Sequence, residues 1–534
     1  MAKKETFIFR EDYPVVSTKQ GKLRGFFYKD VFTFYGVRYA RARRFEMPEE
    51  IPHWKGVQNA TGYGYISPIL GSPKPSGEHR IAHRFWPASE DCQYLNIWSK
   101  SIDKKAKKPV IVWFHGGGFA DGSSIEQSCY DGANLARRED VVVVTVNHRL
   151  NAFGFLDLSK YGEKWKNSGN VGIADLVASL QWVHDNIAGF GGDPKNVTII
   201  GQSGGGMKVT CMGQIPAAAG LFHKAMPMSG IMAPSEDGSP MPSEVTSADI
   251  AKEVFKTAKI KEGNVEALQK LTTKQYISVV NKAGMKFVKA GKSFSWGPVA
   301  NDYYLGDPLV VGFGEYYKTV PTLATTVISE FGARGYKSPK DKVSAAEQKA
   351  MVAKVVGKKN ADRVIAAFKE AYPDKQPMDL VAVDRMMRPA TIMYAEKKAE
   401  VSSAPTYNYL FTLDFALENG VPAWHCSDIP FIFHTKEVQP CMDMGPEVDK
   451  LEDLMSKAVA NFARTGDPNT RGLPKWKPVE PDKCWTMLFD KKPVLKADHD
   501  KELLKVLDET MPVPHLNISQ FYDEEAENDH DWMY

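Results

Sequence analysis

The sequence predicts an α/β fold with a mostly parallel central sheet flanked by helices. Two apolar runs, at 109–114 and 197–200, are rich in valine and isoleucine. Continuous apolar, β-branched runs of this kind are typical of parallel strands that are buried on both faces. A glycine-rich turn directly follows each run, and residues 206–212 after the second turn can form a helix.

The turn after the second run reads Gly-Gln-Ser-Gly-Gly, with the serine at position 203. A serine on a tight turn between a strand and a helix has a strained backbone and an exposed hydroxyl group. This is the G-x-S-x-G nucleophile elbow of α/β-hydrolases. A flexible glycine turn is the alternative for the pattern alone. A phosphate-binding loop is excluded, because Met207 and Val209 stand where that loop needs glycine and a serine or threonine.

The turn after the first run reads His-Gly-Gly-Gly-Phe, starting at His115. Acyl transfer produces an oxyanion, which needs backbone N–H donors directed at one point. Consecutive glycines permit that backbone geometry and leave room for a substrate. The pair of a glycine loop and an elbow, in this order, is specific for an oxyanion hole beside a nucleophile.

Further segments resemble the signatures of one protein family. They are 90–96 (EDCQYLN, with Gln93 in place of leucine), 146–150 and 153–156 (compare NYRL and FGFL), 170–183 (compare NxGLxDQxxALxWV) and 190–194 (FGGDP). With these segments the chain resembles the type-B carboxylesterases, which include cholinesterases, bacterial nitrobenzyl esterases and some fungal lipases. The resemblance covers nearly the whole chain and implies an α/β-hydrolase fold.

The expected elements follow from this fold. Residues before about 44 should form a small antiparallel sheet edge, and further parallel strands are expected at 141–147, 225–228, 323–329 and 407–413. The segments 233–318 and 338–400 should be helical insertions that shape the gorge, with an amphipathic helix starting within 345–352. Because the motifs are parts of one active site, we expect a single catalytic domain over residues 1–534.

A serine hydroxyl needs a base to take its proton, and the base needs a carboxylate. In α/β-hydrolases the chain order is serine, acid, histidine. Among twelve histidines, His425 is favoured because His-Cys-Ser-Asp-Ile-Pro-Phe resembles the family's catalytic histidine loop. The alignment of 321–330 with a strand of the family implies Glu330 as the acid. Phe331 stands where relatives usually have glycine, and Asp428 is an alternative acid.

The resemblance also implies supporting groups. The oxyanion donors would be the amides of Gly117, Gly118 and Gly204. Ser229 matches a serine that supports the acid, although a buried hydroxyl at a strand end is an equal alternative. Gln202 replaces a glutamate that many relatives carry beside the nucleophile. An amide keeps hydrogen bonding without the charge, which argues against choline esters.

Two ion pairs, Arg44 with Glu90 and Arg149 with Asp175, match pairs that hold the scaffold in relatives. The expected function is a serine carboxylic-ester hydrolase that acts on small to medium esters through an acyl-enzyme. No cofactor is expected, and the cysteines and histidines lack metal-ligand spacing. The alternatives are a catalytically inactive cholinesterase-like binding domain, or a transferase or lyase that uses the same triad on a specialised metabolite.

Composition limits the partners and the compartment. A net charge of +3 does not indicate a nucleic-acid surface, and no apolar run has the length of a membrane span. Residues 1–6 lack the apolar core of a secretory signal. Secreted relatives bond the cysteine of the EDC signature to one upstream, whereas here Cys92 is the first cysteine and Ser67 occupies the partner position. We therefore expect a cytoplasmic protein, or a secreted one only if a signal was removed. The acidic stretch 523–531 is expected to be disordered or to dock.

Overall fold

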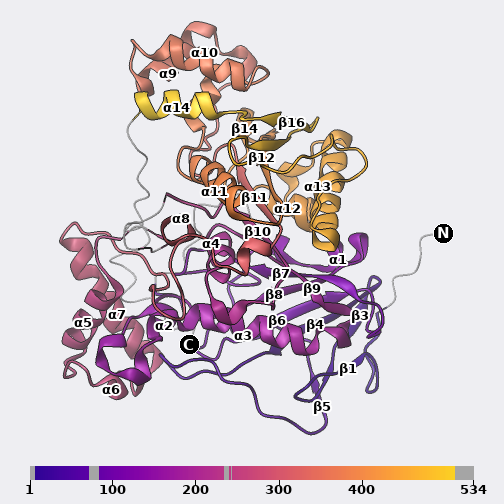
Figure 1. Ribbon diagram of the computed structural model, residues 1–534, viewed down its shortest axis with the longest axis vertical. Coiled ribbons are helices and arrows are strands. Elements are labelled where there is room, and N and C mark those ends of the chain that lie inside the picture. Colours follow the sequence, from indigo (N-terminus) through magenta and orange to yellow (C-terminus); the bar gives the residue numbers. More distant parts are fainter. Residues whose placement is uncertain (1–6, 71–82, 234–237, 239, 242, 512–534) are drawn as a thin grey trace. The chain divides into compact units, whose positions relative to one another are not determined.

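The computed structural model describes residues 7–70, 83–233, 238, 240–241 and 243–511, so the acidic stretch 523–531 lies outside the described residues. These residues divide into two compact units (Figure 1). The first unit holds the described residues up to Ala225 and those from 238 to Tyr317. The second unit holds Met226–Ala233 and the described residues from Lys318 onward.

The first unit is built on a sheet with the strand order β9-β7-β8-β6-β4-β3. Its strands are β3 (Phe26–Tyr28), β4 (Val31–Arg38), β6 (Tyr94–Ser99), β7 (Lys108–Phe114), β8 (Val142–Val146) and β9 (Gly192–Gln202). Strand β7 pairs in parallel with β8 and β9, whereas β3, β4 and β6 pair antiparallel. Valines fill β8 and every residue of it is buried, as the continuous apolar run predicts.

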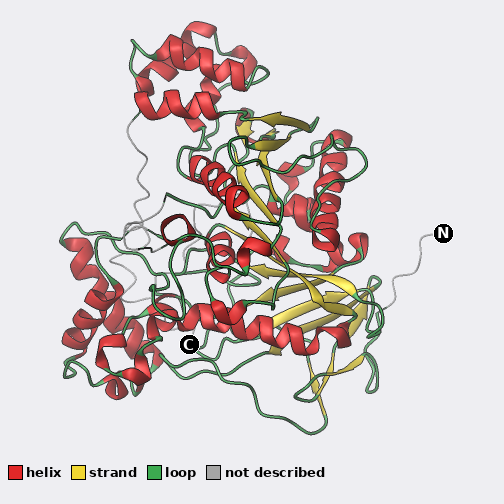
Figure 2. Cartoon of the chain, in the orientation of Figure 1, coloured by secondary structure: helices red, strands yellow, loops and turns green. Residues whose placement is uncertain are grey.

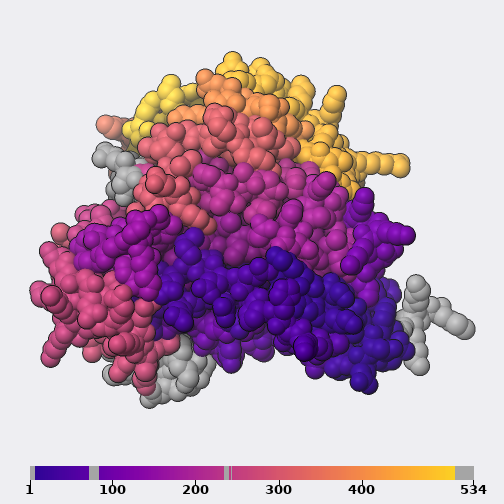
Figure 3. All heavy atoms as spheres, turned by 60° about the horizontal axis from the view of Figure 1, so that its bottom comes forward, coloured from indigo at the N-terminus to yellow at the C-terminus, as the bar shows by residue number. Residues whose placement is uncertain are grey.

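A small second sheet is formed by three other strands near the start of the chain. It contains β1 (Val15–Ser17), β2 (Lys22–Arg24) and β5 (Val57–Asn59), with β1 and β2 antiparallel. Together with β3 and β4 it confirms the antiparallel pairing expected before residue 44. In Figure 3 these N-terminal residues, coloured indigo, form one continuous face of the first unit.

Helices of the first unit cover the sheet and form the first insertion (Figure 2). They are α1 (Ala133–Glu139), α2 (Asn151–Phe155), α3 (Val171–Asn186), α4 (Gly204–Met212), α5 (Ser247–Ala258), α6 (Val265–Gln269), α7 (Thr273–Lys289) and α8 (Pro308–Val311). Capping boxes start α5 and α7, where the hydroxyls of Thr246 and Thr272 accept the backbone N–H of Asp249 and Gln275. Helices α5 to α8 all lie in the segment 233–318, with irregular chain between Lys289 and Pro308.

The two expected ion pairs are both present in the first unit. Arg149 Nε and Nη2 lie 2.9 and 2.8 Å from the two carboxylate oxygens of Asp175, and both side chains are buried. Arg44 Nε lies 2.9 Å from Glu90 Oε2. A two-point guanidinium–carboxylate contact fixes orientation as well as distance, so these pairs hold the loops around them.

The second unit has a sheet with the strand order β16-β15-β12-β11-β10. Its strands are β10 (Lys224–Met228, which crosses the division between the units), β11 (Thr322–Val327), β12 (Thr406–Phe411), β15 (Trp485–Phe489) and β16 (Val494–Ala497). Strands β11, β12 and β15 are parallel, and β16 is antiparallel. A short ribbon of β13 (Asp414–Phe415) and β14 (Val421–Pro422) follows β12 in the chain. The predicted strands are thus confirmed to within a few residues.

Six helices belong to the described residues of this unit: α9 (Ala345–Val356), α10 (Ala361–Ala371), α11 (Met387–Val401), α12 (Ile429–Phe433), α13 (Pro446–Thr465) and α14 (Lys501–Thr510). Helix α9 confirms the expected amphipathic start. Its first turn is a capping box between Ser344 and Glu347. No helix in the described part of the chain combines the length and apolar composition that crossing a bilayer requires.

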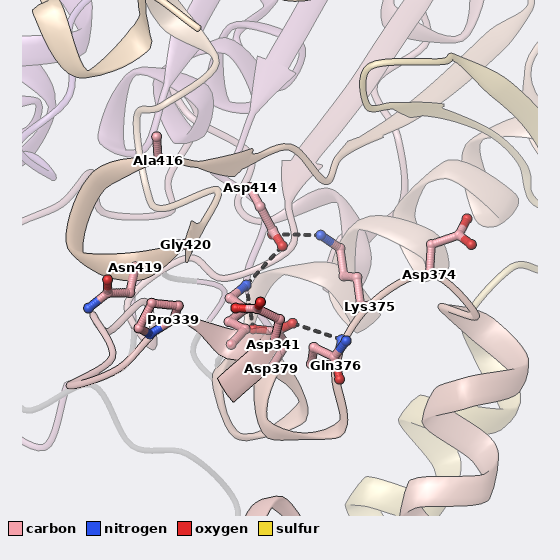
Figure 4. Close-up of a pocket in the computed structure, with 11 residues that line it drawn as sticks. Pro339, Asp341, Asp374, Lys375, Gln376, Asp379, Asp414, Ala416, Asn419 and Gly420 are labelled. Carbon is pink, nitrogen blue, oxygen red and sulfur yellow. Dashed lines mark hydrogen bonds and ion pairs between the residues drawn. The ribbon is translucent and has the colours of Figure 1, made fainter. Parts of the chain in front are cut away.

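A polar cavity of about 460 Å³ lies between the second insertion and β13 (Figure 4). Lys340 Nζ lies 2.8 Å from both Asp379 and Asp414, and Lys375 Nζ lies 2.6 Å from Asp414. Burial opposes ionisation of Asp414, but the charges of Lys375 and Lys340 lower its pKa below the usual value. This network fixes the start of the insertion, at Lys340, and its middle, at Lys375, to the ribbon.

A buried ion pair joins helices and strands of the second unit. Arg388 on α11 donates from Nε and Nη2 to the carboxylate of Asp500, both at 2.9 Å. It also donates to Asn408 on β12 at 2.8 Å and to Thr486 on β15 at 3.2 Å. Burial opposes ionisation of Asp500, yet the Arg388 charge and its hydrogen bonds lower the pKa of that carboxyl. The pair therefore ties α11 to the sheet.

Replacing Arg388 with methionine should lower the free energy of unfolding by about 3–5 kcal/mol, because it leaves the buried Asp500 carboxylate without its partner. The midpoint of urea unfolding measures this loss. The matched control is Arg363→Met, which removes a guanidinium from an exposed pair with Glu509 and should cost less than about 1 kcal/mol. Equal effects of the two substitutions would contradict the role given to Arg388.

Candidate active site

The nucleophile elbow expected at Ser203 is present in the first unit. Strand β9 ends at Gln202 and helix α4 begins at Gly204, so Ser203 occupies the turn between them. Its φ of 59° and ψ of −127° are strained for a residue with a side chain. Gly205 keeps this turn tight, because a Cβ atom there would lie 2.0 Å from the carbonyl oxygen of Phe114.

The glycine loop leaves the adjacent strand at the same end of the sheet. Strands β7 and β9 are parallel with Phe114 opposite Gly201, so the residues after each strand meet. A Cβ atom on Gly116 would lie 3.4 Å from Ser203 Cβ, and one on Gly204 would lie 2.2 Å from the oxygen of Gly118. The loop is therefore in direct contact with the elbow.

Backbone conformation of the loop requires glycine at two positions. Gly117 has a φ of 80° and Gly118 a φ of 60°, which residues with a Cβ atom rarely adopt. The N–H of Gly204 belongs to the first turn of α4, where amides have no partner within the helix. Gln202 is buried, and its Oε1 faces the loop, 3.6 Å from where Gly116 would carry a Cβ.

The expected histidine and acid meet in the second unit. His425 Nδ1 lies 2.6 Å from Glu330 Oε2, and both side chains are buried. The backbone N–H of His425 also donates to the Glu330 carbonyl at 2.8 Å. The second carboxylate oxygen of Glu330 accepts the N–H of Val327 at 3.1 Å. A carboxylate accepts only, so Nδ1 carries the proton and Nε2 is the nitrogen that can act as a base.

Phe331 departs from the glycine of relatives without disturbing this pair. Its ring lies 4.3 Å from the His425 ring, centroid to centroid, at 36°. Phe331 is 53% exposed, so one face of the ring covers the imidazole while much of the rest meets solvent. The turn after Glu330 therefore adds an apolar surface beside the histidine.

The alternative acid, Asp428, has a different partner. Its Oδ2 accepts the Tyr409 hydroxyl at 2.8 Å, and its Oδ1 has no hydrogen-bond partner among the described residues. Burial raises the pKa of Asp428 to about 7, and the nearby Glu330 carboxylate adds to the shift. Of these two carboxylates, Glu330 is the one that bonds the His425 ring.

Sequence reasoning missed a third buried carboxyl in this cluster. Asp384 accepts the backbone N–H of Met387 at 2.9 Å and of Arg388 at 2.6 Å, at the start of α11. Burial raises its pKa to about 7, and the Glu330 charge adds to this. An aspartate just before a helix is a capping signal, but nothing in the sequence relates it to residue 330.

Ser229 is buried directly after strand β10. Its N–H donates to Thr325 at 2.8 Å, while its buried Oγ has no hydrogen-bond partner in the described part of the chain. A role in supporting the acid stays a prediction. Within residues 7–511, apart from those not described, no three histidine, cysteine or acidic side chains are grouped to hold a metal ion.

The model of the carboxylesterase family matches residues 12–505 of the chain. The chain belongs to the carboxylesterase family. It is 29% identical to the para-nitrobenzyl esterase of Bacillus subtilis (strain 168), over 92% of this chain and 97% of that protein. It is 32% identical to carboxylesterase 3B of Mus musculus, over 87% of this chain and 84% of that protein.

Solved structures of other carboxylesterases match the fold of this chain. An esterase from anaerobic Clostridium hathewayi, which can hydrolyze aliphatic aromatic polyesters, is 43% identical with a TM-score of 0.90, over 95% of this chain and 100% of that chain. A para-nitrobenzyl esterase structure is 26% identical with a TM-score of 0.71, over 93% and 99% of the two chains. These carboxylesterases confirm the predicted α/β-hydrolase fold. They also make this chain a carboxylic-ester hydrolase and argue against the inactive binding domain.

Replacing Asp428 with asparagine should change how stability depends on pH. Because the folded pKa is about 7 and the unfolded one about 3.9, the folded protein keeps a proton that the unfolded chain releases. The contribution of this group to the free energy of unfolding is fully present below about pH 4, and it is lost as the pH rises from there through about 7. Asparagine cannot ionise and can still accept the Tyr409 hydroxyl. The variant should therefore equal the wild type near pH 4 and exceed it at pH 8, by about 1–4 kcal/mol.

Urea unfolding at both pH values measures this difference. The control is Asp482→Asn, because that side chain is exposed and its replacement should leave the pH dependence as it is. Parallel pH profiles for Asp428→Asn and the wild type would contradict the raised pKa.

Proposed function

We propose that Ser203, His425 and Glu330 are the catalytic triad of this carboxylesterase, and that the two units together form one catalytic domain. The observation that carries the proposal is the buried 2.6 Å hydrogen bond from His425 Nδ1 to Glu330, which sets the tautomer that a general base needs. The strained turn at Ser203 supports the nucleophile. The family match across residues of both units supports the single domain.

In the proposed reaction the Ser203 hydroxyl attacks the ester carbonyl carbon while His425 Nε2 accepts its proton. The carbonyl oxygen becomes an oxyanion that accepts hydrogen bonds from the amides of Gly117, Gly118 and Gly204. The bond to the alcohol oxygen then breaks, and the imidazolium gives that oxygen its proton. Water attacks the acyl-enzyme with His425 as base, and the acid leaves.

Small to medium esters are the proposed substrates. The half-exposed ring of Phe331 beside His425 favours esters with an aromatic ring near the scissile bond, since a ring can stack on it. The Clostridium hathewayi esterase, which can hydrolyze aliphatic aromatic polyesters, is consistent with this preference. Gln202 carries no charge, so choline esters should have no advantage. A panel of matched aromatic, aliphatic and cationic esters with product analysis tests these preferences and separates hydrolysis from transfer or elimination.

An organophosphate should modify the protein once, on the peptide that contains Ser203, and abolish ester hydrolysis. Mass spectrometry of the digested adduct measures the site. Replacing Ser203 with alanine should lower kcat about 10⁴- to 10⁶-fold, with residual catalysis left to the oxyanion hole. Full inactivation with the label on another residue would contradict the assignment.

Replacing Glu330 with glutamine should lower kcat by about 10³- to 10⁴-fold, because the amide can hold the wrong histidine tautomer. Steady-state kinetics on a nitrophenyl ester measures the effect. Asp428→Asn is the matched control, since it neutralises a buried carboxyl in the same cluster that bonds Tyr409 instead, and it should lower kcat less than about tenfold. The reverse order would make Asp428 the acid.

A cytoplasmic location is also proposed, on the state of the cysteines. All six cysteines are free thiols, and five of them are buried. Ser67 lies within hydrogen-bonding reach of the Cys92 thiol, where a disulfide partner would otherwise stand. Titration of the denatured, unreduced protein should find six thiols. An intramolecular disulfide in that sample would overturn the cytoplasmic assignment.

A further inference from the structure

A buried lysine lies behind the glycine loop. Lys208 is on α4, the helix that starts directly after Ser203, and its side chain is fully buried. Lys208 Nζ donates a hydrogen bond to the backbone carbonyl of His115 at 3.0 Å. His115 is the first residue of the glycine loop, so this bond links the nucleophile's helix to the loop.

The next carbonyl of the loop, that of Gly116, also has a hydrogen-bond donor. His115 Nδ1 lies 2.9 Å from the carbonyl oxygen of Gly116, its own neighbour. A carbonyl accepts only, so Nδ1 carries a proton. Burial, together with the Lys208 charge, lowers the pKa of His115 well below its usual value, which leaves the ring neutral with that one proton. Two successive carbonyls therefore have fixed donors.

Because a peptide group is planar, fixing the direction of its carbonyl also fixes the direction of its N–H. In a trans peptide the C=O and the following N–H point in opposite directions. A carbonyl of Gly116 that is held toward the His115 ring therefore directs the N–H of Gly117 away from the ring. That amide is one of the proposed oxyanion donors, and Gly118 follows it in the loop.

We propose that Lys208 is a positioning residue of the oxyanion hole, which acts by fixing the His115 carbonyl, and with it the start of the glycine loop, to the helix that follows Ser203. The inference rests on the proposed function, since it gives the amides of that loop their role. Oxyanion stabilisation depends on donors that are already aligned before the reaction. Lys208 supplies that alignment without contact with the substrate.

The cost of burying an ammonium group supports a specific role. Burial lowers the pKa of Lys208 to about 7, although the Glu126 charge acts in the opposite direction. The His115 and His148 rings, stacked at 5.2 Å, and the Phe119 ring, 5.9 Å from Nζ, complete its surroundings. An apolar side chain would fill this space at lower cost, so packing alone does not account for a lysine here.

The second unit offers a matched control. Lys398 on α11 is also fully buried, and its Nζ donates to the backbone carbonyl of Val320 at 3.0 Å. Burial lowers its pKa to about 7 as well. Lys398 thus shares with Lys208 the residue type, the burial and the bond to a carbonyl, but the carbonyl that it holds belongs to Val320, just before β11, and not to the glycine loop.

The test compares Lys208→Met and Lys398→Met with the wild type on a nitrophenyl ester. Inhibition by a trifluoromethyl ketone is measured alongside, because the serine adduct of that ketone carries an oxyanion. We expect Lys208→Met to lower kcat about ten- to a hundredfold with KM within about threefold, since misaligned donors lose part of what a lost donor costs. The ketone's inhibition constant should rise by the same factor. Lys398→Met should leave both values within about twofold of the wild type, which is below the effect of a lost donor.

A folded Lys208→Met protein with wild-type kcat and ketone affinity would overturn the proposal. If Lys208→Met does not fold, two other variants at the same position decide. Lys208→Gln can still donate an amide N–H toward the His115 carbonyl, whereas Lys208→Leu cannot, so the glutamine variant should keep more activity and ketone affinity. Equal values for the two would overturn the proposal. A wild-type protein that neither hydrolyses esters nor reacts with an organophosphate at Ser203 would overturn the proposed function itself, and this assignment with it.

Discussion

The arrangement of the first unit depends on the strained backbone of Ser203. A φ of 59° turns the chain sharply from β9 into α4, and the turn needs Gly204 and Gly205 after it, because neither has a side chain. Gly205 is in contact with the Phe114 carbonyl, and Gly204 is in contact with Gly118. The same close approach that permits the strain brings the glycine loop against Ser203, the proposed nucleophile. The strained turn and the position of the proposed oxyanion hole therefore depend on each other, since relaxing the turn would separate the two backbones.

Three buried carboxyl groups lie together in the second unit, and each has a different hydrogen-bond partner. Glu330 bonds the His425 ring, Asp428 bonds the Tyr409 hydroxyl, and Asp384 caps the start of α11. Burial raises the pKa of Asp428 and Asp384 to about 7, and the Glu330 charge contributes to both shifts. Like charges at close range oppose each other's ionisation. Each carboxyl therefore has its own partner, and Glu330 is the one that holds the His425 ring.

The sequence alone predicted the elements whose signals are local. Strand β7 and strand β9 were recognised from their apolar runs, and the position of Ser203 from the pentapeptide between strand and helix. Strand β16 was missed because its residues are exposed or half-buried, so no continuous apolar run marks it. Asp384 and Lys208 were missed for a different reason. Each is defined by a contact across more than forty residues of chain, with Glu330 and with His115, and such contacts leave no local pattern.

The residues that set this chain apart from the family pattern stand next to the catalytic groups rather than at them. Gln202 precedes the proposed nucleophile and Phe331 follows the proposed acid, yet the turn at Ser203 and the 2.6 Å bond of the Glu330–His425 pair are intact. Backbone geometry explains this tolerance, because the turn, the sheet register and the backbone bond between Glu330 and His425 position the catalytic atoms. Side chains at neighbouring positions can then change charge and shape beside the reaction. In such a fold the backbone sets the geometry of the reacting groups, and the side chains at neighbouring positions can alter substrate preference.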